Sequence, residues 1–332
     1  MKEIRWGIIG CGDVTEVKSG PAFNKVSHSS LVAVMRRDGA KAKDYAERHK
    51  VATWYDDANQ LINDPQVNAI YIATPPSSHE AYAIAAIDAG KPVYVEKPMS
   101  LDAGSAFKMA QYAQQKKVKL TVAHYRRAQP AFKKIKQLIK ENVIGEIWMA
   151  RMDFYKASLT SDELQQTKTA WRVDPSISGG GLFHDLAPHQ LDLMYYFFGP
   201  AERVNGIAVS QATHNAVEDM VTGNILFKNG VVFSGIWCFN APAAEEKDCC
   251  EIIGAKGKIK FSIFDVRPVE LTIDGESTFF SFDHLSHVQQ PMIEKVVEYF
   301  LELGDNPCSG ENGAAVMRLI DTITGKKSFN SF

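Results

Sequence analysis

The stretch that decides the fold reads Ile4-Arg5-Trp6-Gly7-Ile8-Ile9-Gly10-Cys11-Gly12-Asp13-Val14-Thr15. Its first half is a mainly apolar run of the kind that is buried on both faces of a parallel sheet. Similar runs recur along the first 123 residues, and helical patterns separate them. The runs lie at 31–35, 69–73, 92–95 and 120–123, and the helical patterns at 40–49, 56–63, 77–89 and 102–117. This alternation predicts βαβ units, and therefore an α/β domain with a doubly wound parallel sheet, the Rossmann fold, over residues 1–123.

The remainder of the chain, residues 124–332, follows an α+β pattern. Its candidate elements begin with a helix at 130–142 and a strand at 146–155, then a polar stretch, a glycine cluster at 178–181 and a helix at 182–198. Strand-like segments then dominate as far as residue 273, with Asn229-Gly230 between two of them as a hairpin signal. Two helical patterns, at 291–303 and 310–323, close the chain. We expect a second domain over 124–332 with a mostly antiparallel open sheet.

The composition excludes several classes of protein. The chain has 332 residues, of which 45% are hydrophobic and 23% charged, with a formal net charge of -2. That length suggests two globular domains. Near-neutral charge without a basic stripe argues against nucleic acid as a partner, and no apolar run approaches the roughly 20 residues of a membrane span. The five cysteines are irregularly spaced and the N-terminus leads directly into a strand, so we expect reduced thiols and a cytoplasmic location.

The glycines at the end of the first strand predict a dinucleotide site. Gly10 permits a tight turn, and Gly12 lets the backbone approach a pyrophosphate. Thr15 stands where the third glycine of the usual pattern would be. The alternative is a glycine turn in an α/β domain that binds no nucleotide. The candidate cofactor-binding residues of this loop are Gly10, Cys11, Gly12, Asp13 and Val14.

The tip of the second strand predicts which nucleotide is bound. NAD-binding folds usually carry an acidic residue there that accepts from the ribose hydroxyls. Here Arg36 and Arg37 follow the strand, and Asp38 comes only after them. Guanidinium groups suit a 2′-phosphate, so NADP is favoured and NAD remains possible. In the alternative, the arginines form a solvated turn and Asp38 is a displaced ribose acceptor.

Two further patterns carry candidate chemistry. Lys97, in Glu96-Lys97-Pro98, follows the fourth apolar run and is a candidate proton handler or hydroxyl donor, unless it forms a surface salt pair. Asp185 and His189 are four residues apart, which puts their side chains about 40° apart on one helix face. An imidazole can accept a hydroxyl proton at neutral pH. The alternative is a structural surface pair on that helix.

Taken together, these motifs resemble the Gfo/Idh/MocA oxidoreductases, the family of glucose–fructose oxidoreductase and inositol 2-dehydrogenase. They are the glycine loop, Thr74-Pro75-Pro76, Glu96-Lys97-Pro98 and Gly179-Gly180-Gly181 followed by Asp185 and His189, and they occur in order over nearly the whole chain. The resemblance implies a Rossmann domain that binds NAD(P). It also implies that residues 124–332 form the domain for substrate binding and oligomerisation, and that the protein is a homodimer or homotetramer.

The resemblance also implies roles for individual residues. Lys97, Asp185 and His189 are the catalytic candidates, and all three would contact substrate. Further cofactor contacts are expected at Thr74, Pro75, His79 and Glu96, and further substrate contacts at Tyr125, Arg126, Trp171 and Arg172. His79 and His124 can equally well be structural histidines.

No metal is expected, because His184 points about 100° away from Asp185 on the same helix and no further ligand is spaced to join them. The sequence therefore predicts an NAD(P)-dependent oxidoreductase, with NADP favoured, that moves a hydride between nicotinamide and a sugar, polyol or related cyclic alcohol or ketone. Two alternatives remain: a glycosidase or lyase that uses tightly bound NAD(P) for transient oxidation, and a non-catalytic NADP-binding regulator.

Overall fold

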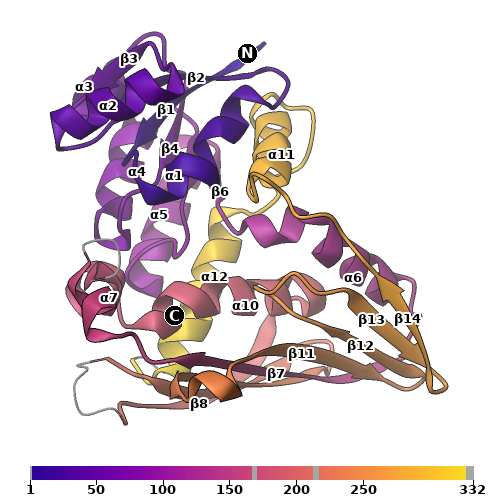
Figure 1. Cartoon of the computed structure of the whole chain (residues 1–332). Helices are drawn as coiled ribbons and strands as arrows, with labels where there is room; N and C mark the ends of the chain where they lie inside the picture. Colours follow the sequence, from indigo (N-terminus) through magenta and orange to yellow (C-terminus); the bar gives the residue numbers. More distant parts are fainter. Residues whose placement is uncertain (1, 167–169, 212–216, 327–332) are drawn as a thin grey trace. The chain divides into compact units, whose positions relative to one another are not determined.

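The computed structural model describes residues 2–166, 170–211 and 217–326 (Figure 1). The chain divides into two compact units. They are Met1–Gln129 with Leu285–Ala314, and Pro130–His284 with Ala315–Phe332. The sequence alone places a single division between residues 123 and 124, whereas the contacts also bring the segment 285–314 into the first unit.

The first unit is built on a six-stranded parallel sheet in the order β3-β2-β1-β4-β5-β6. The strands are β1 (Ile4–Ile9), β2 (Ser29–Met35), β3 (Thr53–Tyr55), β4 (Ala69–Ile72), β5 (Val93–Val95) and β6 (Leu120–Val122). The predicted doubly wound sheet is confirmed. The strand order reverses on the two sides of β1, and ligands bind at this switch point in open α/β sheets. The sequence did not reveal β3, because Thr53-Trp54-Tyr55 is only partly buried and is not a continuous apolar run.

Helices connect these strands, and their ends carry recognisable caps. The helices of the first unit are α1 (Asp13–Val17), α2 (Gly39–His49), α3 (Ala58–Asn63), α4 (His79–Asp88), α5 (Ala103–Lys116) and α11 (Gln290–Phe300). Asp102 caps α5 by accepting from the Ser105 N–H. The core between the elements is aromatic: Trp6, Tyr71 and Tyr94 are fully buried, and the last two stack with ring centroids 5.1 Å apart.

The second unit contains an eight-stranded sheet in the order β14-β13-β12-β11-β7-β10-β9-β8. The strands are β7 (Ile147–Ala157), β8 (Ala201–Val209), β9 (Met220–Phe227), β10 (Val232–Ala241), β11 (Lys247–Gly254), β12 (Gly257–Phe261), β13 (Val269–Ile273) and β14 (Glu276–Phe280). Only the β7–β10 pair is parallel among these neighbours, so the expected mostly antiparallel sheet is confirmed. Asn229-Gly230 forms the predicted hairpin turn, with Gly230 at φ 88°. Strand β14 was not expected, although Asp274-Gly275 before it is a hairpin signal.

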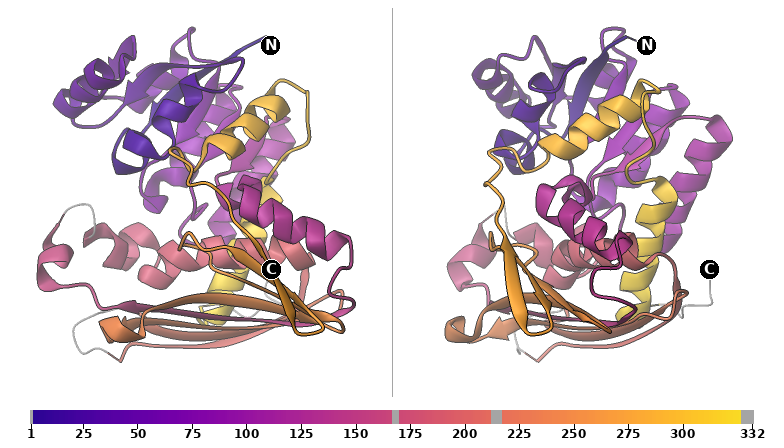
Figure 2. Two further views of the ribbon diagram at one scale, coloured as in Figure 1. Left: turned by 45° about the vertical axis from the view of Figure 1, so that its right-hand side comes forward. Right: turned by 90° about the vertical axis from the view of Figure 1, so that its right-hand side faces the viewer.

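Helices cover one face of this sheet, as the two views of Figure 2 show. They are α6 (Pro130–Lys140), α10 (Leu182–Phe198) and the end of α12 (Gly310–Ile323). Phe183 of α10 packs edge-on against Trp237 of β10, with centroids 5.0 Å apart. At Gly206 of β8, a Cβ would lie 2.5 Å from the Ile323 carbonyl oxygen, so only glycine lets α12 approach this closely. Two short helices, α7 (Ser161–Gln165) and α9 (Pro175–Ser178), lie in the polar stretch.

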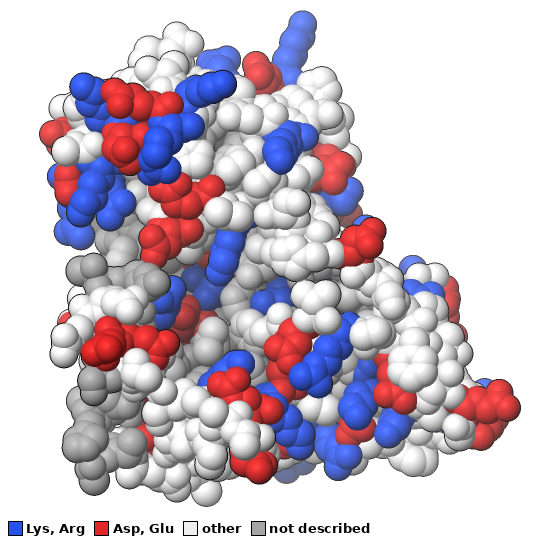
Figure 3. Space-filling model, in the orientation of Figure 1, with Lys and Arg blue, Asp and Glu red and all other residues white. Residues whose placement is uncertain are grey.

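None of the described helices combines the length and apolar character that crossing a membrane requires. On the face shown in Figure 3, basic and acidic side chains are interspersed over both units.

Candidate active site

The turn after β1 fits tightly against the turn after β4. Gly10 has φ 95°, and a Cβ there would lie 2.8 Å from the Thr74 backbone nitrogen. Only glycine satisfies both constraints. Two of the predicted cofactor segments, the glycine loop and Thr74-Pro75, are therefore neighbours at the carboxyl ends of adjacent strands.

Thr15, which replaces the third glycine, has a role within the loop itself. Its Oγ1 accepts from the Gly12 N–H at 2.9 Å and donates to the Gly12 carbonyl at 2.8 Å. The Thr15 carbonyl in turn accepts from the buried Tyr45 hydroxyl at 2.7 Å. The Thr15 hydroxyl thus closes the loop through the Gly12 backbone, in place of a glycine contact.

The basic tip of β2 reaches back to the glycine loop. The Arg36 Nη1 donates to the Cys11 carbonyl at 3.3 Å, while Arg37 is exposed. Burial raises the pKa of the Cys11 thiol to about 11, so this cysteine is protonated at neutral pH. Asp38 caps α2, since its Oδ1 accepts from the Lys41 N–H at 3.2 Å and its Oδ2 pairs with the Lys41 Nζ at 3.2 Å.

Lys97 follows β5 and is anchored through its neighbour. The buried Glu96 carboxylate accepts from the Tyr71 hydroxyl at 2.6 Å and from the Gln289 Nε2 at 2.6 Å. Its other oxygen accepts from the Lys97 backbone N–H at 3.1 Å. The Lys97–Pro98 peptide bond is cis. The Lys97 side chain is partly exposed, so the network fixes the backbone from which the ammonium group extends.

His79 occupies a structural position. Its ring is completely buried, with Nε2 2.7 Å from the Thr74 carbonyl and Nδ1 3.0 Å from the Pro98 carbonyl. Burial lowers the pKa of His79, so the ring is neutral and donates from one nitrogen. It links the turn after β4 to the turn after β5, which favours the structural alternative for this residue. Of the remaining first-unit candidates, Tyr125 is buried and the Arg126 guanidinium lies 5.6 Å from its ring centroid.

In the second unit the predicted substrate residues come together on α10 and the segment before it. The Arg172 Nε lies 3.0 Å from the Asp185 Oδ2, and the Arg172 guanidinium lies 5.0 Å from the Trp171 ring centroid. Asp185 is in the first turn of α10, where a carboxylate also interacts favourably with the helix dipole. His189 is one turn further along and only 5% exposed. The sequence predicted all four as substrate contacts, and they come from two neighbouring segments of one unit. The other predicted substrate contacts, Lys97, Tyr125 and Arg126, belong to the first unit.

His184 has a separate role that the sequence did not reveal. A Cβ at Gly180 would lie 2.0 Å from the His184 Nδ1, so the glycine makes room for this ring. That Nδ1 lies 2.6 Å from the Glu218 Oε1, and the Nε2 lies 2.9 Å from the Lys326 Nζ. Burial acts to raise the pKa of Glu218, but the hydrogen bond and charge of His184 lower it overall. Within the described ranges, no group of three or more histidine, cysteine or acidic side chains is placed to hold a metal ion.

Two protein-family models match the sequence of this chain. Residues 4–124 match the family model described as an oxidoreductase family with an NAD-binding Rossmann fold, and residues 132–260 match the Gfo/Idh/MocA C-terminal domain. The chain belongs to the Gfo/Idh/MocA oxidoreductase family.

Two named relatives match three quarters or more of the chain. Oxidoreductase P35 of Formosa agariphila is 48% identical over 324 residues, which cover 97% of this chain and 98% of that protein. The 1,5-anhydro-D-fructose reductase of Ensifer adhaerens is 28% identical over 260 residues, covering 77% of this chain and 74% of the reductase. The structure of levoglucosan dehydrogenase with NADH and levoglucosan shares the fold, with a TM-score of 0.87 at 22% identity, over 97% of this chain and 96% of that one.

Two contributions to the first-unit site carry no local signal in the sequence. Gln289 follows β5 by almost two hundred residues, and Tyr71 lies within an apolar strand where a core role is the ordinary expectation. Only the fold brings their polar atoms to Glu96. The Glu-Lys-Pro motif marks the position of this network without indicating its partners.

The glycine loop of this family member is braced by an ion-pair cluster that generates a pH prediction. Glu16 lies 2.8 Å from the Arg48 Nη1 and 2.7 Å from the His49 Nε2, which joins α1 to α2. Hydrogen bonds from Arg48, followed by those from His49, lower the pKa of Glu16 from 4.5 to about 2, although burial opposes this.

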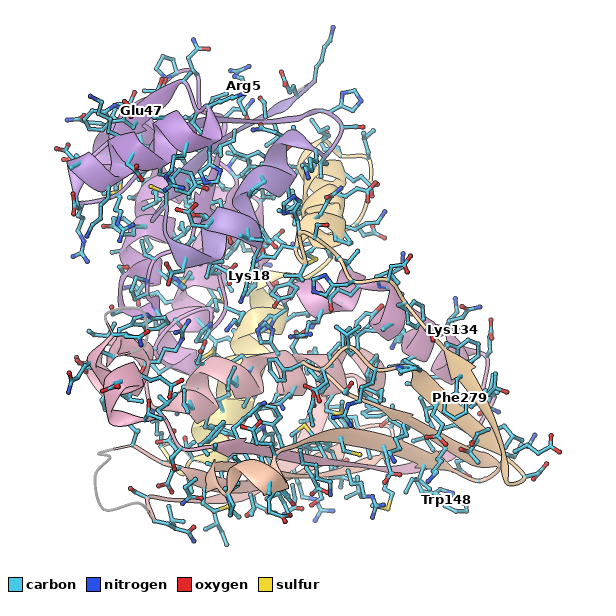
Figure 4. The ribbon with its side chains drawn as sticks, in the orientation of Figure 1. Arg5, Lys18, Glu47, Lys134, Trp148 and Phe279 are labelled. Carbon is cyan, nitrogen blue, oxygen red and sulfur yellow. The ribbon has the colours of Figure 1, made fainter. Side chains whose placement is uncertain are left out.

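Glu16→Gln should lower the Tm at neutral pH, because it removes these pairs. Since the folded pKa lies below the unfolded one, the stabilisation is complete above the unfolded value of 4.5 and is lost as the pH falls toward about 2. The Tm difference between wild type and variant should therefore narrow between about pH 5 and about pH 3 in calorimetry. Glu47→Gln is the control, since Glu47 (labelled in Figure 4) is exposed and lies 3.8 Å from Lys43. A difference for Glu16→Gln that stays constant with pH would contradict the prediction.

Proposed function

We propose that the protein is an NADP-dependent oxidoreductase that acts on a CH–OH group, or the corresponding ketone, of a sugar, polyol or related cyclic compound. The observation that carries the proposal is the position of Lys97 at the carboxyl end of a parallel strand, held by the buried Glu96 network. The names of two proteins with similar sequence or fold, 1,5-anhydro-D-fructose reductase and levoglucosan dehydrogenase, support the substrate class. We also propose a cytoplasmic location, for which the irregular spacing of the five cysteines is the ground.

The chain's own residues have separate tasks in this reaction. A bound nicotinamide supplies the hydride acceptor or donor. We assign to Lys97 a hydrogen bond to the reacting oxygen, where its charge stabilises a developing alkoxide. We assign to His189 the transfer of the hydroxyl proton, with Asp185 hydrogen-bonding a substrate hydroxyl from its fixed position beside Arg172.

A substrate panel tests the function directly. Sugars, polyols and keto-sugars are incubated with NADP(H) or NAD(H), and absorbance is followed at about 340 nm, where the reduced nicotinamide absorbs. Turnover with a stoichiometric absorbance change supports the proposal. Glycoside cleavage without added nucleotide and without an absorbance change would instead indicate the transient-oxidation alternative. Nucleotide binding with no turnover of any compound would indicate the regulator.

The geometry also supports the choice of nucleotide. Arg36 lies against the glycine loop, where it can reach a 2′-phosphate, and Asp38 is already engaged as the cap of α2. A charged hydrogen bond contributes roughly 1.5–3 kcal/mol, so NADP should bind about 10- to 150-fold more tightly than NAD.

Arg36→Asp should abolish this preference or invert it, because a carboxylate repels the phosphate and accepts from ribose hydroxyls. Direct titration of both nucleotides measures the ratio. Arg5→Gln, at the opposite end of β1 (labelled in Figure 4), is the control for a general loss of positive charge. Equal or tighter binding of NAD by the wild type would refute the proposal and return Asp38 as the ribose partner.

His189→Asn should leave NADP affinity within a few-fold and lower kcat by roughly 10²–10⁴, because asparagine keeps the shape but cannot transfer the proton. Steady-state kinetics and nucleotide titration on the same preparation check both parts. Near-wild-type turnover by His189→Asn on the identified substrate would exclude the role.

Lys97→Met should lower kcat by roughly 10² or more, because it keeps the length of the side chain but removes the donor and the charge. Lys97→Arg should restore little activity, since the guanidinium is larger and differently shaped. Full activity in Lys97→Met would leave the lysine as a surface group.

We also propose a homodimer or homotetramer that uses the uncovered face of the eight-stranded sheet. Apolar side chains on that face are well exposed, among them Ile207 at 67%, Val232 at 46% and Met149 at 36%. Exposed apolar side chains on a sheet face that no helix covers favour an interface.

Ile207→Lys with Val232→Lys should shift the protein toward monomer in light scattering at micromolar concentration, because two buried charges would lack partners. Leu303→Lys is the control, since Leu303 is 71% exposed and belongs to the first unit, outside this sheet. A wild type that is monomeric under these conditions would contradict the proposal.

A further inference from the structure

A buried carboxylate outside the predicted site organises a turn beside His189. Asp248 of β11 is only 4% exposed. Its Oδ2 accepts backbone N–H bonds from Phe264 at 2.6 Å and from Asp265 at 2.9 Å, and both oxygens accept from Ile263. The Ser262 hydroxyl closes the same turn by donating to the Asp265 carbonyl at 2.7 Å. Three consecutive backbone groups are therefore fixed by one carboxylate.

The turn directs the Phe264 ring to His189. The two ring centroids are 5.7 Å apart, with the rings almost perpendicular at 79°. On its other side Phe264 contacts Phe154, a buried residue of β7, at a centroid distance of 5.0 Å. Phe264 is partly exposed, so part of this residue remains accessible beside its contacts with Phe154 and His189.

A substrate that brings a hydroxyl to His189 would lie beside Phe264. The molecule meets an aromatic surface beside the imidazole, and aromatic faces are electron-rich. A pyranose or other ring has hydroxyls around its edge and weakly positive C–H groups on its faces, so a C–H face can pack on the phenyl ring. A hydroxyl or charge directed at the same surface would lose water without gaining a partner.

We infer that Phe264 is a specificity-determining residue that favours cyclic substrates with a C–H face next to the reacting carbon, and that Asp248 is the positioning residue that holds it there. The inference rests on the proposed function, because it takes His189 as the group that exchanges the proton. Within the proposed substrate class, the inference favours cyclic compounds over open-chain polyols.

The test compares two substrates of one reaction type. For wild type and variants, kcat and KM are measured for the best cyclic substrate of the panel and for an open-chain polyol with the same configuration at the reacting carbon. Phe264→Leu should lower the cyclic-to-open-chain ratio of kcat/KM about tenfold or more, mainly by raising KM for the ring. Phe264→Trp should keep the ratio, because it restores an aromatic face.

Asp248→Asn should lower the same ratio by a smaller factor, because the amide loses the charge and its NH2 group cannot accept from the Ile263 N–H as the second carboxylate oxygen does. The matched controls are Phe279→Leu, a phenylalanine distant from Asp248 on β14, and Asp265→Asn, whose side chain pairs with the Arg267 Nη2 at 2.8 Å. Both should leave the ratio within about twofold, as expected of surface substitutions. If Asp248→Asn does not fold, the Phe264 variants still decide the inference.

A second measurement is independent of turnover. The His189 ring protons, assigned by their absence in His189→Asn, should move in the NMR spectrum of Phe264→Leu, because the ring current of the neighbouring phenyl group is lost. They should stay in place in Phe279→Leu. An unmoved His189 signal, or an active enzyme whose substrate ratio is unchanged in Phe264→Leu, would overturn the inference alone. A wild type that oxidises or reduces no compound of the panel would overturn the proposed function and the inference with it.

Discussion

The buried carboxylate of Glu96 is the interaction on which the candidate site of the first unit depends. A carboxylate removed from water is costly unless every oxygen finds donors. Here the donors come from three places: a strand residue, Tyr71; the adjacent backbone at Lys97; and Gln289, almost two hundred residues later. Because loss of any of these donors would leave the buried carboxylate with an unsatisfied oxygen, the network holds the start of the Lys97 segment in one position.

In the second unit, two carboxylates are likewise held by groups from other segments of the chain. Asp248 is satisfied by three backbone N–H groups and so holds the turn that carries Phe264, while Glu218 is paired with His184 behind the glycine turn of α10. Asp248 is buried and Glu218 is partly buried, and each holds a segment that contacts α10, the helix that carries His189. Removing one partner of such a pair usually costs more than the pair contributes, because the other charge is left buried and alone.

The Arg172–Asp185 pair differs, because both side chains retain contact with solvent. Such a pair contributes little to stability. Its value lies in geometry, since it holds a carboxylate and a guanidinium on the same segment of the unit as His189. Little free energy is needed to separate such a pair. The Asp185 carboxylate can therefore accept from a substrate hydroxyl in place of Arg172, as we propose, more readily than a fully buried carboxylate could.

Local patterns in the sequence determined a large part of this protein. Continuous apolar runs separated by helical periods specified the parallel sheet, because a strand covered on both faces must be apolar throughout. Asn229-Gly230 specified a hairpin, because few other residues adopt positive φ at a two-residue turn. The spacing of Asp185 and His189 placed both on one face of α10, since helix geometry is local. The motifs also identified the family, which the comparisons confirm.

Tertiary structure alone decided the rest. No motif marks Gln289 or Asp248 in the sequence. Their roles arise only because folding brings Gln289 to the Glu96 carboxylate and Asp248 to the backbone N–H groups of residues 263–265. The histidines show the same limit: the sequence does not distinguish His79, His184 and His189. Only the fold gives His79 its carbonyl neighbours, and His184 its carboxylate and ammonium neighbours. A side chain's partners are set by residues that are distant along the chain, so no local pattern records them.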